Sequence, residues 1–486
     1  MCVLVIAEKP SVAQSLSAVI GAKERKDGYL EGNGFRVSWC VGHLAGLSDA
    51  AGYDPRYEKW NRDDLPIIPE HWKMTVGKDK KKQFQVLKAL MNAPDVTEVV
   101  NACDAGREGE LIFRSVYELA GCKKPMKRLW ISSMEDTAIR QGFEELRPGA
   151  EYDGLYEAAL CRARADWLVG INATRFFSVL YHHTLNIGRV MSPTLALIVQ
   201  REAEIAAFKP EPFYTAVLET SGITANSERL GDLEEAKKIQ MDCRGKTITV
   251  VKVEQKRRSE KPPALYDLTS LQRVANRLLG FTAQQTLDYL QSLYEKKLCT
   301  YPRTDSRYLT SDMAATLPVL VNLTAKAMDF AKGIAVDCDS ARIINDKKVS
   351  DHHAVIPTQN LRTMELAGLP VGERAILELI ALRLLCAVGS AYEYAETVMV
   401  LKCAGHSFTA KGRSVICPGW KAFENSYRTS LKSAPEPEPS GEIKELPDLE
   451  EGQEFSEGLI QIKEGKTSPP KNFTQDTLLS AMETAG

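Results

Sequence analysis

Three acidic side chains follow two apolar, β-branched runs of the chain. Glu8 follows the run 3–7, and Asp104 and Glu108 follow the run 96–102. Such runs are typical of strands that are covered on both faces. Because ligands gather outside the carboxyl ends of parallel strands, we expect the three carboxylates to lie together. Their mutual repulsion would require a divalent cation, and hard oxygen ligands with room for water and phosphate favour Mg²⁺.

The neighbours of these acids favour a phosphate ligand. Lys9 and Arg107 supply positive charge, and Gly106 and Gly109 would let a phosphate approach the backbone closely. The alternative is a solvated turn followed by the charged first turn of a helix, where glutamate suits the helix dipole. The sequence of this stretch alone leaves both interpretations open.

A second stretch with chemical potential is 300–307, which reads Thr-Tyr-Pro-Arg-Thr-Asp-Ser-Arg. A tyrosine, with a pKa of about 10, attacks only where its proton is removed or its phenolate is stabilised. Arg303 can bind a phosphate through two N–H groups, and Pro302 restricts the backbone beside Tyr301. A phosphotyrosine diester conserves the energy of a broken strand, so such a site could cut and reseal DNA without ATP. A packed, hydrogen-bonded tyrosine is the alternative.

Other chemistries have less support in the sequence. The Gly-Lys-Thr triplets at 245–247 and 465–467 lack the upstream glycine of a phosphate-binding loop, which argues against ATP-driven chemistry. The 11 cysteines contain no C-x-x-C pair, which argues against a zinc ribbon and a disulfide scaffold. The pair His352 and His353 could bind metal, transfer protons or lie in a polar turn.

The elements expected around these residues change along the chain. Up to about residue 150, strand-like and helix-like runs alternate, which predicts an α/β domain with a mainly parallel sheet. Residues 152–208 have a helical pattern, 213–255 predicts antiparallel strands, and 264–394 is helical again. A second β-like part follows at 396–403 and 407–411. The proline-rich stretch 433–441 predicts an exposed loop.

Bulk properties set broad limits. A chain of 486 residues predicts several domains. The net charge of −2 gives no sign of nucleic-acid binding, although a local basic groove can exist in a neutral protein. No run of 18 apolar residues occurs, so no membrane span is expected.

Several motifs together resemble the type IA DNA topoisomerases, specifically the bacterial topoisomerase III branch. The matching stretches, in the order of that family, are 7–11 (Ala-Glu-Lys-Pro-Ser), 104–110 (the acidic Toprim motif), 188–195 (Gly-Arg-Val-Met-Ser-Pro-Thr-Leu), 263–268, 301–305 and 351–358. The resemblance covers essentially the whole chain, and motifs in this order are far more specific than any one of them.

The resemblance implies a multidomain ring of α/β, helical and β-rich parts that surrounds a hole able to pass DNA. The implied domains are a Toprim domain at 1–150, a helical DNA-binding domain at 151–212 completed by 466–486, a β-rich arch at 213–262 and 395–465, and a helical domain carrying the tyrosine at 263–394. The tyrosine domain would lift away as a gate after cleavage. We expect the chain to be truncated at its C-terminus.

The resemblance also implies roles for single residues. Tyr301 would form a 5′-phosphotyrosyl link, and Arg303 would position the phosphate. Glu8 would act as acid or base near the leaving 3′-oxygen and help to bind Mg²⁺ with Asp104 and Glu108. Lys9 would stabilise the phosphate and His352 would assist beside the tyrosine. The residues implied in binding single-stranded DNA are Arg164, Asp166, Gly188, Arg189, Val190, Met191, Ser192, Pro193, Thr194 and Arg303.

The resemblance further implies a monomeric, cytoplasmic, nucleoid-associated bacterial enzyme, with a helicase or a single-strand-binding protein as a further partner.

The chain departs from the family pattern where Gly106 replaces a second aspartate and Met191 replaces a glutamine. These changes remove one potential metal ligand and one potential DNA hydrogen bond.

Two other functions stay open at this point: a Toprim-type nuclease or phosphotransferase, and a non-catalytic fragment that binds single-stranded DNA.

Overall fold

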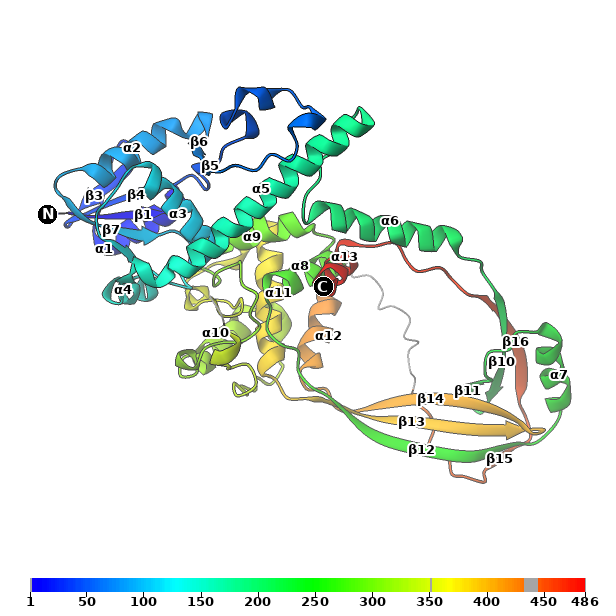
Figure 1. The fold of residues 1–486 in the computed structure, drawn as a ribbon. Coiled ribbons are helices and arrows are strands. Elements are labelled where there is room, and N and C mark those ends of the chain that lie inside the picture. Colours follow the sequence, from blue (N-terminus) through cyan, green and yellow to red (C-terminus); the bar gives the residue numbers. More distant parts are fainter. Residues whose placement is uncertain (1, 350–351, 432–444, 486) are drawn as a thin grey trace.

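The computed structural model describes residues 2–349, 352–431 and 445–485. The predicted loop at 433–441 and the first residue of the motif 351–358 lie outside these ranges. The described chain follows a ring (Figure 1). From an N-terminal α/β domain, two long helices lead to a distant sheet, and three long antiparallel strands of that sheet span the distance back to helices beside the α/β domain.

The N-terminal domain is built on a seven-stranded sheet. Its strands, in spatial order, are β2 (Glu24–Lys26), β3 (Tyr29–Gly32), β4 (Phe35–Trp39), β1 (Cys2–Ala7), β7 (Val96–Ala102), β8 (Met126–Arg128) and β9 (Arg147–Pro148). Only the central strands β4, β1, β7 and β8 are parallel, whereas the pairs β2–β3, β3–β4 and β8–β9 are antiparallel. The expectation of a mainly parallel sheet is therefore correct for the centre and wrong for both edges.

Four helices accompany this sheet: α1 (Pro10–Ile20), α2 (Lys81–Asn92), α3 (Arg107–Leu119) and α4 (Asp136–Glu144). Helix α1 has a proline in its first turn and stops at Gly21, whose φ of 87° is readily adopted only by glycine. A two-stranded sheet of β5 (Ala45–Leu47) and β6 (Met74–Val76) completes the domain.

Two helices leave the N-terminal domain. Helix α5 (Asp153–Tyr181) contacts α3 and β5, and α6 (Met191–Ala207) has no buried residue. The single helical stretch expected at 152–208 is thus divided at His182, which has a left-handed conformation. None of the described helices is both long enough and apolar enough to cross a lipid bilayer.

The distant sheet joins strands from two parts of the chain. Its order is β15 (Glu454–Phe455), β12 (Ile248–Glu260), β13 (Tyr392–Cys403), β14 (His406–Cys417), β11 (Ile223–Asn226), β10 (Pro212–Thr220) and β16 (Leu459–Lys466). Helix α7 (Leu233–Cys243) packs against β10 and β16. Strands β13 and β14 extend beyond the predicted runs because their partly polar ends continue the ladder toward the helices.

The helical part that contains Tyr301, here called the tyrosine domain, comprises α8 (Leu268–Leu279), α9 (Ala283–Glu295), α10 (Leu317–Ala327) and α11 (Val371–Val388). Helix α12 (Lys421–Ser430) packs against α11 through buried Phe423 and Tyr427, although the sequence placed this segment in the β-rich arch. The segment before helix α13 reaches α6, where Arg201 donates to the Lys471 carbonyl at 2.9 Å, so the expectation that 466–486 completes the domain at 151–212 stays a prediction. Helix α13 (Gln475–Glu483) itself packs on α8. Its Asp476 pairs with Arg273 of α8 at 2.8 Å, which explains that position.

The apolar core of the tyrosine domain is continuous with one face of the N-terminal sheet. Buried Val12 and Leu16 of α1 belong to the same core as Leu290 and Tyr294 of α9. This shared core holds the tyrosine domain against the carboxyl ends of β1 and β7, where the predicted acids lie.

Candidate active site

Glu8 and Asp104 are brought together by the adjacent parallel strands β1 and β7. Glu8 follows β1 directly and is 7% exposed. Burial and the nearby Asp104 carboxylate raise the pKa of Glu8 to about 7. Burial also raises the pKa of Asp104, against the opposing effects of Lys9 and Arg303. One of these acids can therefore hold a proton near neutral pH.

Tyr301 reaches this acidic pair from the tyrosine domain. Its phenol donates a hydrogen bond to Oδ2 of Asp104 at 3.4 Å, although the two residues are 197 positions apart. Its backbone N–H is held by the Ser132 carbonyl at 3.1 Å. Burial and the two carboxylates raise the pKa of Tyr301 above its usual value, while Arg303 lowers it. The phenol is therefore protonated at rest, and its reaction requires a base and a nearby cation.

His352 supports the tyrosine ring. The two ring centroids lie 4.2 Å apart, and His352 is 2% exposed. Its Nε2 contacts the carbonyl of Ala105, which can only accept, so Nε2 carries the proton and Nδ1 accepts from the Ser132 hydroxyl at 3.0 Å. Burial lowers the pKa of His352 to about 4. His352 is thus neutral at pH 7 and fixed between Tyr301 and the turn 103–106, which carries Asp104 and is here called the acidic turn.

Glu108 does not complete the expected group of three acids. Its carboxylate contacts Nε2 of His43, and this contact lowers the pKa of Glu108. No cluster of three or more metal-ligating side chains occurs among the residues that the structure describes. Glu8 and Asp104 nevertheless fit a divalent cation, because their buried carboxyl oxygens are hard ligands whose charge a cation would neutralise. Glu108 could join them only by leaving His43.

Lys9 is paired across the domain boundary. Its Nζ lies 3.4 Å from Oε1 of Glu295, the last residue of α9, and both side chains are about one-third exposed. Gln291, one helical turn earlier, donates to the same Oε1 at 3.1 Å. Neither His43 nor Glu295 was identified from the sequence, because each meets its partner only through the fold.

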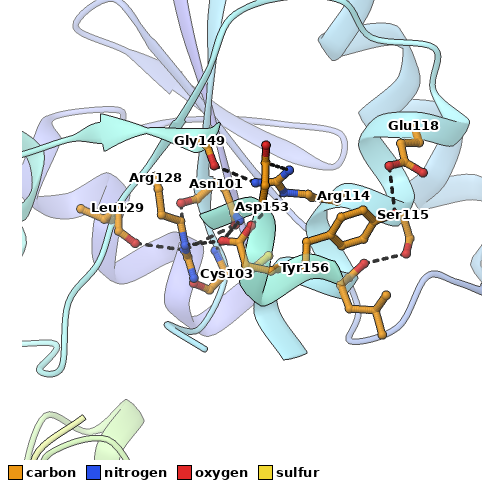
Figure 2. Close-up of polar contacts among 12 residues, drawn as sticks. Asn101, Cys103, Arg114, Ser115, Glu118, Arg128, Leu129, Gly149, Asp153 and Tyr156 are labelled. Carbon is orange, nitrogen blue, oxygen red and sulfur yellow. Dashed lines mark hydrogen bonds and ion pairs between the residues drawn. The ribbon is translucent and has the colours of Figure 1, made fainter. Parts of the chain in front are cut away.

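Arg128 and Arg114 belong to a buried polar network beside the turn that carries Asp104, and Figure 2 shows both arginines with their partners. The Arg128 guanidinium, 1% exposed, donates to the carbonyls of Asp104 at 2.8 Å and Cys103 at 2.7 Å. Its Nε lies 2.7 Å from the Glu110 carboxylate, which also pairs with Arg114 at 3.0 Å. Removing one partner of such a buried pair typically costs about 3–5 kcal/mol. The network therefore fixes the backbone that carries Asp104.

The start of α3 needs a glycine. A Cβ on Gly109 would lie 1.9 Å from the Asp104 carbonyl oxygen, far inside van der Waals contact. Gly106, the N-cap of α3, has a φ of 147° and open space around it. Gly109 thus permits the tight packing of the acidic turn on its helix, and Gly106 permits the backbone conformation that enters the helix.

A cavity of about 640 Å³ opens beside the tyrosine. Tyr301, Arg303 and His352 line one side, and α3 with Glu108 lines another. The α5 wall supplies Arg162 and Asp166. Arg162 is missing from the sequence-based set, although it stands one helical turn before Asp166 and therefore on the same face. The predicted Arg164 lies instead with its guanidinium 5.3 Å from the centre of the Trp72 ring.

The segment 188–194 forms the entry to α6. Arg189 pairs with Asp166 at 2.6 Å and thereby connects this segment to the cavity wall. Val190 and Met191 are more than half exposed, and Pro193 is also exposed. The other polar members serve the helix start: the Ser192 hydroxyl accepts from the Gly188 N–H at 3.2 Å, and the Thr194 hydroxyl donates to the Val190 carbonyl at 2.8 Å.

The fold and the site define a Toprim-containing protein with a tyrosine at its acidic pocket. Residues 3–134 match the Toprim domain, and residues 150–486 match the family described as DNA topoisomerase. The chain therefore belongs to the DNA topoisomerase family, in its type IA class.

Its similarity to named relatives extends over almost the whole chain. It is 41% identical to DNA topoisomerase 3 of Bacillus subtilis (strain 168) and 41% identical to DNA topoisomerase 3 of Bacillus licheniformis. Each alignment covers 99% of this chain and 67% of the relative. The fold is similar to full-length topoisomerase I from Thermotoga maritima, with a TM-score of 0.75 and 22% identity over 99% of this chain and 75% of that one.

Proposed function

We propose that this ATP-independent DNA topoisomerase cuts one DNA strand with Tyr301, passes DNA through the break and reseals it at the Glu8–Asp104 pocket. The observation that carries the proposal is the 3.4 Å hydrogen bond from the Tyr301 phenol to Asp104. Relaxation of negative supercoils and decatenation are the expected outcomes. A Toprim nuclease would have no use for a tyrosine in this position.

Proton movements follow from the contacts of the pocket. In cleavage, the phenol oxygen forms a bond to phosphorus while the bond from phosphorus to the 3′-oxygen breaks. The phenol proton passes to Asp104, the carboxylate already bonded to it. The leaving oxygen takes a proton from Glu8, whose pKa of about 7 suits a general acid near neutral pH. Religation reverses both transfers.

Two positively charged side chains, those of Arg303 and Lys9, contact the DNA phosphate in this proposal. Arg303 is exposed at the cavity and close enough to lower the pKa of Tyr301, so it can offset the charge that develops during attack. Lys9 stands next to Glu8 in sequence and can bind a non-bridging phosphate oxygen. His352, being neutral and hydrogen-bonded through both ring nitrogens, orients the Tyr301 ring and does not take up the phenol proton.

Glu8 and Asp104 would hold Mg²⁺, with Glu108 joining them if it leaves His43. When bound, the ion would neutralise the two carboxylates and draw charge from the phosphate during religation. Because Gly106 offers no carboxylate, we expect a more hydrated and weaker site than one with a third acid in this turn.

The DNA strand would enter along the cavity between α3 and α5. The border of this cavity is charged, because Asp166 pairs there with Arg162 and Arg189. DNA phosphates can take the place of Asp166 as the partner of these two arginines. Met191 and Val190 offer apolar contact to bases. We further propose that the tyrosine domain moves as the gate, that the enzyme acts at the nucleoid, and that a helicase or a single-strand-binding protein supplies its single-stranded substrate.

Relaxation of a negatively supercoiled plasmid without ATP tests this function. The chain should relax the plasmid with Mg²⁺ and lose this activity in chelator. Tyr301→Phe should abolish relaxation. Asp104→Asn should leave oligonucleotide binding nearly intact but impair both cleavage and resealing, because Asp104 takes the phenol proton in this proposal. Nicked products with free 5′ ends, unchanged by Tyr301→Phe, would instead indicate a nuclease, and binding without any cleavage would indicate a non-catalytic fragment.

A further inference from the structure

We propose that Glu295 is a positioning residue for Lys9. Its carboxylate pairs with the Lys9 ammonium until DNA enters the site, and a DNA phosphate then takes its place. This inference rests on the proposed function, because it takes Lys9 as a phosphate ligand. The motifs that identify the family do not include Glu295, and it reaches Lys9 only through the packing of α9 against the N-terminal domain.

The Glu295 carboxylate is aimed at Lys9 by its own helix. Gln291 precedes it by one turn and donates to the same Oε1 that faces the Lys9 ammonium, at 3.1 Å and 3.4 Å respectively. A carboxylate on a free rotamer would not be held there, because an isolated, partly exposed ion pair barely offsets the entropy of fixing two long side chains. The second contact favours a defined position.

The pair is accessible to a competitor. The Lys9 and Glu295 side chains are 32% and 28% exposed, so neither is enclosed by protein. A phosphodiester resembles a carboxylate in charge and in oxygen acceptors, and the two anions repel each other at close range. A phosphate that binds Lys9 therefore has to displace Glu295 or remain close to its negative charge. In either case the Lys9–Glu295 pair lowers the affinity for DNA.

The position of the pair gives the exchange a consequence for the gate. Lys9 lies on the N-terminal domain and Glu295 on the tyrosine domain, so the phosphate releases a contact between the two. A second ion pair in the same interface, Lys297 with Asp136 at 2.6 Å, does not involve Lys9. DNA entry would thus weaken one of these two contacts and leave the other in place.

Binding of a fluorescent single-stranded oligonucleotide, measured in a Tyr301→Phe background at low salt, tests the proposal. Glu295→Gln should bind about two- to fivefold tighter, the range expected from a partly exposed ion pair. The gain should vanish in Lys9→Met, where Glu295→Gln should have no further effect. Asp136→Asn is the matched control, because it removes an acid from the same interface without freeing Lys9, so any change it causes should persist in Lys9→Met.

Two results would overturn the inference: unchanged affinity of Glu295→Gln, or a gain of equal size with and without Lys9. The second would mean that only overall charge matters. Failure of the proposed function is distinguishable, because Lys9→Met alone would then bind the oligonucleotide as well as the parent. Equal thermal unfolding midpoints of all variants should accompany these measurements, since a misfolded variant would lose affinity and could not gain it.

Discussion

At the scale of single residues, the site combines a protonated phenol with two acids in different environments. Asp104 accepts from Tyr301, while Glu8 is shielded enough for its pKa to rise to about 7. The sequence indicated both acids and the tyrosine because strand ends and motif order are visible in it. It gave no sign of His43 or Glu295, whose partners come from distant segments. Arg162 could have been found from its helical spacing to Asp166.

The neutral His352 leads to a pH prediction. Its pKa falls from about 6.5 when unfolded to about 4 when folded. As the pH falls, this histidine therefore binds a proton in the unfolded chain before it does so in the folded one. The free energy of unfolding should decrease by up to about 3 kcal/mol between pH 6.5 and pH 4. Thermal unfolding of the parent and of His352→Gln should show a smaller acid-induced loss for the variant. Parallel pH profiles of the two proteins would contradict the buried neutral imidazole.

At the scale of elements, the strand-to-helix turn from β7 into α3 positions the chemistry. Strand β7 was predicted at its observed bounds, since its apolar run has clear ends. The antiparallel β3–β4 edge was missed, although Asn33 and Gly34 form a tight turn with φ of 47° and 79°. An Asn-Gly pair is a strong hairpin signal, but the half-buried strands beside it are too short to show alternation. Helix α12 was missed because it lies between segments with strand-like sequence, and the whole stretch 395–465 was assigned to the β-rich arch.

Gly109→Ala tests the packing of this turn. The new Cβ would meet the Asp104 carbonyl oxygen, so the turn must shift. Overpacking of this kind costs about 1–3 kcal/mol, and a displacement of about 1 Å at a reacting group can slow catalysis about a hundredfold. We expect the relaxation rate to fall at least about tenfold. Gly154→Ala in α5, where a Cβ meets nothing within 4 Å, should retain full activity; equal rates for both variants would refute the positioning role.

At the scale of the whole molecule, the ring closes where the tyrosine domain meets the N-terminal domain. The alternation of β and helical segments predicted separate parts, and one sheet indeed joins strands from before and after the tyrosine domain. The contacts that close the ring, such as Lys297 with Asp136, leave no periodic signal in the sequence. If the tyrosine domain moves as the proposed gate, strand passage would require these contacts to break and re-form, because Tyr301 and the acids lie on opposite sides of the interface.

A covalent link across this interface should separate cleavage from strand passage. Cysteines at Asp136 and Lys297, joined by a short bis-maleimide after the exposed Cys161 and Cys338 are changed to serine, would hold the tyrosine domain closed. The linked protein should cleave an oligonucleotide at nearly the parent rate but lose plasmid relaxation by at least about tenfold. The unlinked double-cysteine protein is the control. Full relaxation by the linked protein would show that the ring opens elsewhere.

The most direct measurement is the identity of the residue that carries DNA after cleavage. The chain would be incubated with a single-stranded oligonucleotide, denatured to trap the intermediate, digested with protease and analysed by mass spectrometry. We predict one nucleotide-bearing peptide, with the 5′-phosphate esterified to Tyr301, and none from Tyr301→Phe. DNA attached to another residue, or free 5′-phosphate ends with no adduct, would contradict the account of the site.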